Sequence, residues 1–483
     1  MTARGFLFLI FRCLIFLPVL PAQPLHPTGE MYDLVIRSGR VLDPASRFDS
    51  VATIGILEGR IAAISTTHLA GKVVLDASGL VVAPGFIDIL SYAPGEVGVW
   101  NKIADGVTTN LSMHGGTSSP RAWYAEQARK HWPLNYGASF FYTQARQQFV
   151  TDRYAAARPA NISRLTAIAE RALQEGALGI SFSLEYVPGI SPGEIRPMMK
   201  LARQYNVPVF FHARYSDMEE PGTNLDALRE IVGYARESGA SVHIDHLNST
   251  GGTFSMKQSL AMIDSARSNG LDVTACVYPY TYWGTYLNSA RFDRGWQQRF
   301  HISEHDLQLG GSSERLTEES FAKYRRQGKL AIAYAIPEED VEDALHAPYV
   351  MIGSDAILQT GYNNHPRASG AFSRTIAVYV RVKRTISLMD AIAKMTILPA
   401  RRLEQSSDSM KRKGRLQIGA DADIVIFDAA RIRDRATVEH PERMSEGILY
   451  VIVDGQIVKD PKGLRKEVRP GRSIRGSAGA TQN

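Results

Sequence analysis

Two histidines end successive apolar segments of this sequence and could together bind one metal ion. His212 ends the segment VPVFFH, and His246 ends the segment SVHIDH. If both segments are neighbouring parallel strands, the two side chains can reach one cation, because adjacent strands lie about 5 Å apart. Neutral imidazole suits zinc, and a catalytic zinc keeps one position open for water. The alternative is a pair of hydrogen-bonded histidines that binds no metal.

Three other polar residues lie near such segment ends. Asp355 ends YVMIGSD, where it could ligate a metal or take a proton from a metal-bound water, although an aspartate after a strand can also cap a helix. Arg367, in NNHPRASGAFSR, could pair a substrate carboxylate bidentately, or it could be a solvated loop charge. His243 lies an odd number of residues from His246, so alternation predicts that it points away from the site and is structural.

The elements that must position these residues form a long alternating pattern. From about residue 81 to 410, short apolar segments alternate with amphipathic helical stretches, which predicts a closed (β/α)₈ barrel. Such barrels build their chemistry at the C-terminal ends of the strands. His114, His212, His246 and Asp355 all fall at predicted strand ends. Residues 281–348 are too many for an ordinary connection, so we predict an insertion there that covers the barrel mouth.

Both ends of the chain are rich in predicted strands. Residues 31–80 contain VATIGILEGRIAAI, with a hairpin turn at Gly59-Arg60, and residues 411–470 contain GILYVIVDGQIVKD, with a hairpin at Asp454-Gly455. We predict one small β-sandwich domain assembled from both chain ends beside the α/β barrel. Residues 471–483 are expected to form a disordered tail.

Residues 1–22 have the features of a secretory signal peptide. Arg4 precedes an apolar run, and Ala22 is a small residue at a plausible cleavage point. Arg12 interrupts the run, so no stable membrane span is expected in the mature protein. We predict export to the periplasm or secretion. The alternative is a misassigned start, because Met31 stands just before the first predicted strand.

The composition and charge of the chain argue against nucleic acid as a partner. The formal charge of +6 is small and dispersed, and no basic run is interleaved with aromatic residues. Binding to nucleic acid is therefore not expected. Cys276 is the one cysteine left if the first 22 residues are removed, so no intrachain disulfide is expected. Nothing in the sequence sets the oligomeric state.

Nine sequence segments resemble the amidohydrolase superfamily, and they occur in the same order as in that family. Within it they resemble the N-acyl-D-amino-acid deacylase branch, which includes D-aminoacylases and N-acyl-D-glutamate deacylases. The segments are VVAPGFID, DGVTT, GALGISFSLEY, FFHAR, VHIDHLNSTG, MIGSD, HPRASGAFSR, AIAKMTILPARRLE and GRLQIGADADIVIFD. They cover nearly the whole chain after residue 31. The resemblance implies a metal-dependent barrel with a flanking β-sandwich that hydrolyses amide bonds, usually with zinc.

The resemblance also implies roles for individual residues. His212 and His246 match the metal ligands after the fifth and sixth strands, and Asp355 matches the aspartate after the eighth. Tyr186 and Arg367 match positions that recognise the substrate carboxylate. We also assign Asn248, within VHIDHLNSTG, to substrate binding.

The first strand departs from the pattern of the family. Its members carry His-x-His after PGFID, where this chain has Leu90 and Tyr92. Leucine cannot bind metal, and tyrosine is an unusual replacement. After DGVTT, relatives carry a bridging cysteine or glutamate at or next to the place of His114. We therefore predict one zinc ion, held by His114, His212 and His246, with an open position.

Three functions remain open at this point. The first is a one-zinc deacylase that acts on N-acyl amino acids, of D configuration by family resemblance, or on small peptides, with Asp355 as the base. The second is a non-catalytic binding protein that keeps the pocket without the reaction. The third is a metal-free reaction in which Tyr92, His114 and Asp355 act as acid and base.

Overall fold

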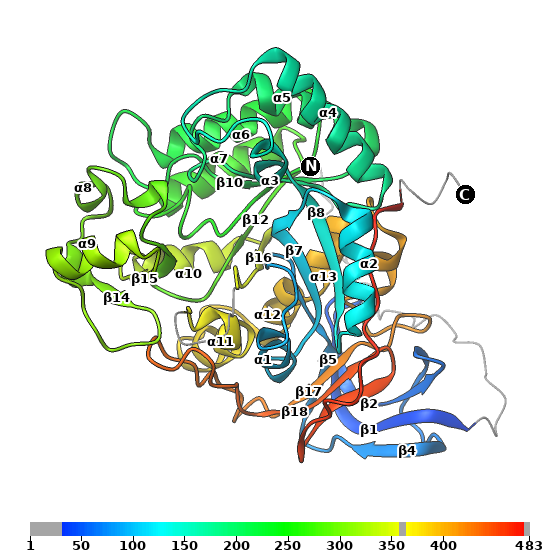
Figure 1. Cartoon of the computed structure of the whole chain (residues 1–483). Coiled ribbons are helices and arrows are strands. Elements are labelled where there is room, and N and C mark those ends of the chain that lie inside the picture. The colour runs from blue at the N-terminus through cyan, green and yellow to red at the C-terminus, as the bar shows by residue number, and fades with distance from the viewer. Residues whose placement is uncertain (1–30, 357–363, 478–483) are drawn as a thin grey trace, which may run out of the picture.

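A computed structural model describes residues 31–356 and 364–477 of the chain. The predicted signal peptide lies outside these residues. Figure 1 shows two parts: a barrel ringed by helices, and a β-rich domain to one side of it. Within the described residues, no helix combines the length and the apolar character needed to cross a membrane.

The barrel is built from eight parallel strands in the order β16-β12-β11-β10-β9-β8-β7-β6. Their bounds are β6 Phe86–Asp88, β7 Val107–Thr117, β8 Asn135–Phe141, β9 Ile180–Ser183, β10 Val209–His212, β11 Val242–Ile244, β12 Val273–Val277 and β16 Val350–Ile352. The first and last strands meet just beyond their C-terminal ends, where Ser91 pairs with Ala356 and the Asp355 amide donates to the Leu90 carbonyl at 2.7 Å. The predicted (β/α)₈ barrel is confirmed.

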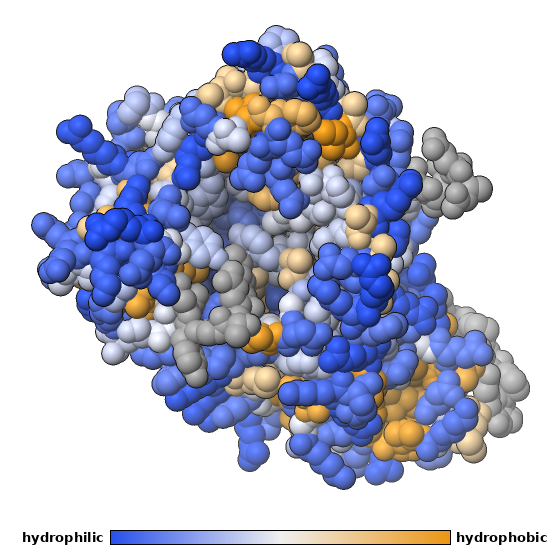
Figure 2. All heavy atoms as spheres, viewed as in Figure 1, coloured by the Kyte–Doolittle hydropathy of each residue, from blue (hydrophilic) through white to orange (hydrophobic). Residues whose placement is uncertain are grey.

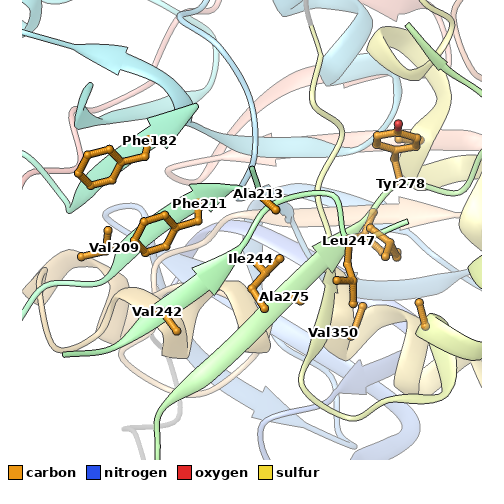
Figure 3. Close-up of a cluster of buried hydrophobic side chains, with 14 of the residues drawn as sticks. Phe182, Val209, Phe211, Ala213, Val242, Ile244, Leu247, Ala275, Tyr278 and Val350 are labelled. Atoms are coloured by element: carbon orange, nitrogen blue, oxygen red, sulfur yellow. The ribbon is translucent and has the colours of Figure 1, made fainter. Parts of the chain in front are cut away.

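Alternation along the strands separates two apolar layers. On β10, Phe210 points into the barrel, where it packs with a cluster that includes Leu111 and Met351. Its neighbour Phe211 points outward and stacks on Phe182, with ring centroids 5.4 Å apart. Figure 3 shows this outer layer, which buries the strands against the surrounding helices. The same alternation turns His212 inward, because side chains on a strand change face at every residue.

Helices cover the outside of the barrel. Local sequence signals mark the ends of these helices. On α6, Thr223 and Asp226 form a capping box at the N-terminus, and Gly239 ends the helix at its C-terminus with φ 68°. The helices are α1 Gly98–Ala104, α2 Pro120–Lys130, α3 Tyr142–Arg146, α4 Pro159–Gln174, α5 Pro192–Tyr205, α6 Asn224–Ser238, α7 Met256–Ser268, α10 Glu338–His346, α11 Arg367–Arg374 with its π-helical continuation Thr375–Val382, α12 Leu388–Met395 and α13 Ile397–Leu403.

The β-rich domain joins the two ends of the chain. Its strands are β1 Tyr32–Asp43, β2 Phe48–Leu57, β3 Arg60–Ser65, β4 Gly71–Asp76, β5 Val81–Pro84, β17 Ile424–Phe427, β18 Ile448–Val453, β19 Gln456–Asp460 and β20 Gly463–Leu464. The pairing of β5 with β17, in which Pro84 lies opposite Ile424, connects the two halves. Asp454 and Gly455, with φ of 49° and 76°, form the expected hairpin turn. This domain extends to Pro84, slightly beyond the predicted boundary at residue 80.

The predicted insertion is a small three-stranded sheet with short helices. Its order is β13-β15-β14, with β13 Trp283–Tyr286, β14 Leu307–Leu309 and β15 Leu330–Ala333, and it carries α8 Trp296–Phe300 and α9 Glu318–Arg326. It is shorter than predicted. The sequence Glu338–His346 forms α10, which packs on α7 and on barrel strands and so belongs to the barrel.

The expectation of a disordered tail is wrong for residues 471–477. Backbone hydrogen bonds hold this segment along β8: the Tyr136 amide donates to Arg472, and the Ile474 amide donates to Tyr136. The hydroxyl of Tyr124 also donates to the Ile474 carbonyl at 2.7 Å. These bonds satisfy backbone groups that a disordered tail would leave to water.

Candidate active site

Three histidines meet at the C-terminal end of the barrel. His212 is the last residue of β10, His114 lies in β7, and His246 follows β11. His246 is reached through a tight bend, since its own φ is 26°, a conformation that a non-glycine residue adopts only when its surroundings demand it. Figure 2 shows a hollow in this face of the molecule, over the region where Figure 1 carries the labels β7 and β12.

The geometry of the three side chains fits a single metal ion. One ring nitrogen from each lies within 4.8 Å of the others, and all three residues are buried. His212 Nδ1 and His246 Nε2 are 3.1 Å apart. Two nitrogens bound tetrahedrally to one zinc at its usual bond length would be about 3.3 Å apart. The three buried imidazoles are therefore a donor set that could hold a metal ion.

The second nitrogen of each ring is held by another group. His114 Nδ1 bonds to Asp245 Oδ2 at 3.1 Å, and His212 Nε2 bonds to Glu185 Oε2 at 2.9 Å. Carboxylates only accept, so these nitrogens carry the protons and leave the opposite nitrogens free as ligands. His246 Nδ1 lies 3.2 Å from the Thr250 hydroxyl, which can accept a hydrogen bond from this nitrogen or donate one to it.

Burial favours the neutral imidazole that a metal requires at His212 and His246. It lowers the pKa of His212 to about 4 and the pKa of His246 well below its usual value. At His114, burial also opposes the charged form, but the hydrogen bond to Asp245 and the charge of Asp355 outweigh burial and raise the pKa. At Glu185, burial opposes ionisation, but the charge of Arg291 and the hydrogen bond from His212 hold its pKa at about 2. Glu185 is thus an anion that orients His212, while the ring itself stays neutral.

Asp355 and Arg367 form a buried ion pair at the edge of this cluster. Asp355 Oδ2 lies 2.7 Å from Arg367 Nη2 and 3.8 Å from His246 Nε2. The other oxygen, Oδ1, is buried and accepts no hydrogen bond from a described residue. Asp355 has φ 50°, so it also sits in a strained conformation. Arg367 lies over the Tyr278 ring, 4.8 Å from its centroid.

Tyr186 lies close to the histidines, but Asn248 is engaged elsewhere. The Tyr186 ring packs on His212 with centroids 4.6 Å apart, and its hydroxyl donates to Thr285 at 3.0 Å. Asn248 donates to the backbone carbonyls of Tyr278 and Tyr280, and its oxygen receives the Tyr278 amide. Asn248 therefore supports the backbone of the segment after β12. Its side-chain amide is engaged there and not with a substrate, which contradicts our assignment of Asn248 to substrate binding.

His243 lies away from the three histidines, but not for the reason predicted. It faces into the barrel, where it packs on Phe210 and bonds to Thr274 at 2.8 Å. The parity rule fails because the strand ends at Ile244 and the chain bends before His246.

Comparisons with known proteins agree with this site. The model of the amidohydrolase family matches residues 319–459. An N-acyl-D-glutamate deacylase of Alcaligenes xylosoxydans xylosoxydans is 30% identical, over 93% of this chain and 98% of its own length. The chain belongs to the amidohydrolase family. A D-aminoacylase of the same organism is 29% identical, over 88% and 94% of the two chains, which places this amidohydrolase in the N-acyl-D-amino-acid deacylase branch.

Solved amidohydrolase structures share the fold over nearly the whole chain. An N-acyl-D-glutamate deacylase from Bordetella bronchiseptica, complexed with zinc and a phosphonate that mimics the tetrahedral intermediate, has a TM-score of 0.79 and 27% identity, and covers 92% of this chain and all (100%) of its own. A D-aminoacylase structure with a TM-score of 0.81, 25% identity and the same coverage concerns the functional role of the binuclear metal centre in that enzyme, with one-metal activation and second-metal attenuation. This amidohydrolase is accordingly a metal-binding hydrolase of amide bonds.

Leu90 and Tyr92 are the two first-strand residues that the sequence predicts to bind no metal. Leu90 is buried in the apolar interior of the barrel. Tyr92 lies edge-on to His114, with ring centroids 5.3 Å apart. Burial raises the pKa of Tyr92 well above its usual value, so the phenol is protonated. Neither side chain contributes a nitrogen ligand for a second ion.

Three residues of the site were missed from sequence. Asp245 and Glu185 hold the histidine rings, and Arg291, from the insertion, bonds to Glu185 Oε2 at 3.1 Å. Asp245 could have been found as the inward residue after β11. Glu185 stands in GISFSLEY, one residue before Tyr186, but nothing local indicates its partners, since Arg291 is 106 positions away.

Proposed function

We propose that this protein is a zinc-dependent deacylase that hydrolyses N-acyl amino acids, of D configuration, or related small peptides. One zinc ion would be held by His114, His212 and His246. The observation that carries the proposal is the arrangement of these three imidazoles, whose ligand nitrogens lie within 4.8 Å of one another while their second nitrogens are held by other groups. The names of the relatives supply the substrate class.

Zinc bound there would lower the pKa of a water molecule so that it can attack an amide at neutral pH. Asp355 is the base in this proposal. Its Oδ1 is buried without a partner among the described residues, so it can accept a proton from the attacking water. The water oxygen bonds to the carbonyl carbon, the C–N bond breaks, and Asp355 returns the proton to the leaving nitrogen.

Arg367 and Tyr186 would bind the carboxylate of the substrate. Arg367 uses Nη2 for Asp355 and for the Gly284 carbonyl, and its Nε and Nη1 have no partner among the described residues. The guanidinium can therefore keep its place and still offer donors to a carboxylate. The predicted signal peptide would send the enzyme to the periplasm or outside the cell.

Metal analysis combined with an assay tests this function. Purified mature protein should contain close to one equivalent of zinc and should release acetate from N-acetyl-D-glutamate faster than from its L enantiomer. A neutral amide of similar size serves as the control substrate. Two tightly bound ions would contradict the one-zinc site. Absence of metal, with unchanged binding of an N-acyl amino acid, would instead identify a binding protein.

A further inference from the structure

Tyr92 is held in a prepared place beside His114. The two ring planes are 81° apart, with centroids at 5.3 Å. Gly115 makes room for the phenol, because a Cβ at that position would lie 2.5 Å from Tyr92 Cδ1. Asn110 Nδ2 also donates to the Tyr92 carbonyl at 2.9 Å and fixes its backbone. The side chain is therefore positioned by its surroundings and does not merely fill space left by a lost ligand.

The hydroxyl of Tyr92 lies within electrostatic range of four groups at the barrel mouth. Its electrostatic neighbours are Asp355, Arg367, Tyr186 and Tyr286, which come from four different segments around the mouth. No described residue accepts or donates a hydrogen bond at this hydroxyl. A protonated phenol next to three converging histidines is thus available to a bound molecule.

Most of the other donors near the cluster already make a hydrogen bond or an ion pair. The Tyr186 hydroxyl donates to a threonine, and the Asn248 amide supports the backbone after β12. The ammonium of Lys102 is paired with Asp88. Arg367 is paired with Asp355. Two neutral phenols in this part of the described structure have no hydrogen-bond partner, Tyr278 and Tyr92. Tyr278 is fully buried beneath the Arg367 guanidinium, whereas Tyr92 is partly exposed and can be reached by a bound molecule.

A one-zinc deacylase needs such a donor. When water attacks an amide, negative charge develops on the carbonyl oxygen, and a preorganised donor aimed at that oxygen lowers the barrier. In a two-metal site, an ion can polarise the carbonyl; here Leu90 and Tyr92 supply no ligands for a second ion. We propose that the Tyr92 hydroxyl donates a hydrogen bond to the oxygen of the scissile amide and stabilises the oxyanion that forms.

This inference rests on the proposed function, and no proton leaves Tyr92. Its hydrogen bond shortens as the oxyanion forms and relaxes when the C–N bond breaks. Such a donor strengthens binding of the transition state more than of the substrate. Removing it should therefore lower kcat by about 100-fold, the effect expected for one oxyanion donor, and leave KM nearly unchanged.

The test is Tyr92→Phe, which removes one oxygen atom and keeps the ring. Zinc content, kcat and KM for N-acetyl-D-glutamate are measured, together with the affinity for a phosphonate analogue in which tetrahedral phosphorus replaces the amide carbonyl. We expect unchanged zinc, unchanged KM, a fall in kcat of about 100-fold and a comparable loss of phosphonate affinity. Tyr205→Phe makes the same chemical change at a partly buried phenol that bonds to Glu170, and should alter none of these values.

Unchanged kcat and phosphonate affinity in Tyr92→Phe would overturn the inference. A fall in kcat accompanied by loss of zinc would also overturn it, because Tyr92 would then act by supporting His114. If the unmutated protein hydrolyses no acyl amino acid, the proposed function fails on its own. The phosphonate titration still decides the role of Tyr92 in that case, since equal affinities of the two proteins would contradict the hydrogen bond.

Discussion

Arg367 Nη2 lies 2.7 Å from Asp355 Oδ2, so the group proposed to bind substrate and the group proposed to act as base are joined in one buried ion pair. Removing one partner of such a pair leaves the other charge buried and uncompensated. The pair occupies Oδ2 of Asp355 and leaves its Oδ1 free of described partners. A substrate carboxylate that reaches Arg367 would compete with Asp355 for the guanidinium.

Replacing Asp355 with asparagine should remove activity and leave zinc in place. The amide has a similar shape but cannot accept the proton of the attacking water, so we expect kcat to fall by at least about 100-fold. Zinc per chain and kcat are measured on the same preparation. Activity that survives this change would move the base elsewhere, with His114 the next candidate.

Arg367→Lys should weaken binding of acidic substrates more than tenfold, an order-of-magnitude expectation for loss of a planar guanidinium at a buried charged contact. KM is compared for N-acetyl-D-glutamate and for a neutral amide of the same size. If the two substrates are affected equally, Arg367 is not the carboxylate anchor.

His212→Ala and His246→Ala should each abolish tight zinc binding, because only two of the three histidines would remain. His114→Ala decides whether that histidine is the third ligand. Metal is measured after dialysis against a weak chelator. A His114→Ala protein that keeps a full equivalent of zinc would show that His114 is not a ligand.

Glu185→Gln should weaken zinc affinity by about 10-fold while the fold is retained, because the anion that orients His212 is lost. Zinc affinity is measured by competition with a chromogenic chelator. The matched control is Glu194→Gln, which breaks a buried pair with Arg146 away from the histidines. An equal loss of affinity in both variants would attribute the effect to general destabilisation.

Lys394 should make stability depend on pH in the alkaline range. Burial lowers its pKa to about 8, and its Nζ donates to the carbonyls of Ala347 and Val350. The unfolded chain, with a lysine pKa near 10.4, binds more protons than the folded chain between these values. Stability from this group therefore rises with pH across that window, by roughly 3 kcal/mol. Urea unfolding of the unmutated protein and of Lys394→Met, at several pH values, should show this rise only in the former.

Much of the site could be predicted because the C-terminal ends of all the barrel strands lie at the same face of a (β/α)₈ barrel. Alternation in VPVFFH was enough to turn His212 inward, and His114, His246 and Asp355 follow from the ends of their own strands. The prediction for His243 rested on parity, which holds only while the chain stays extended. The bend at His246, with φ 26°, breaks that condition, so that His246 reaches the other histidines although the preceding Asp245 also faces inward and bonds to His114.

Contacts between distant segments could not be predicted from local pattern. The engagement of Asn248 depends on where the backbone after β12 runs, and the pairing of Glu185 depends on an arginine in the insertion. The tail at residues 471–477 gave no strand signal, yet its backbone finds partners along β8. In each case the hydrogen-bond or ion-pair partner comes from a segment that is distant in sequence and is brought close only by the tertiary structure.

The junction of β5 with β17 constrains the order in which this protein can assemble. Arg60 and the Gly419 carbonyl, which bond across the same domain, are 359 positions apart in the chain. The N-terminal strands therefore emerge from the ribosome long before their partners exist, and contacts of such long range form slowly because a large loop must be closed first. Until the C-terminal strands arrive, β5 has an unpaired edge, and an unpaired edge invites pairing with other chains. Loss of even a short stretch that includes β17 would leave that edge permanently open.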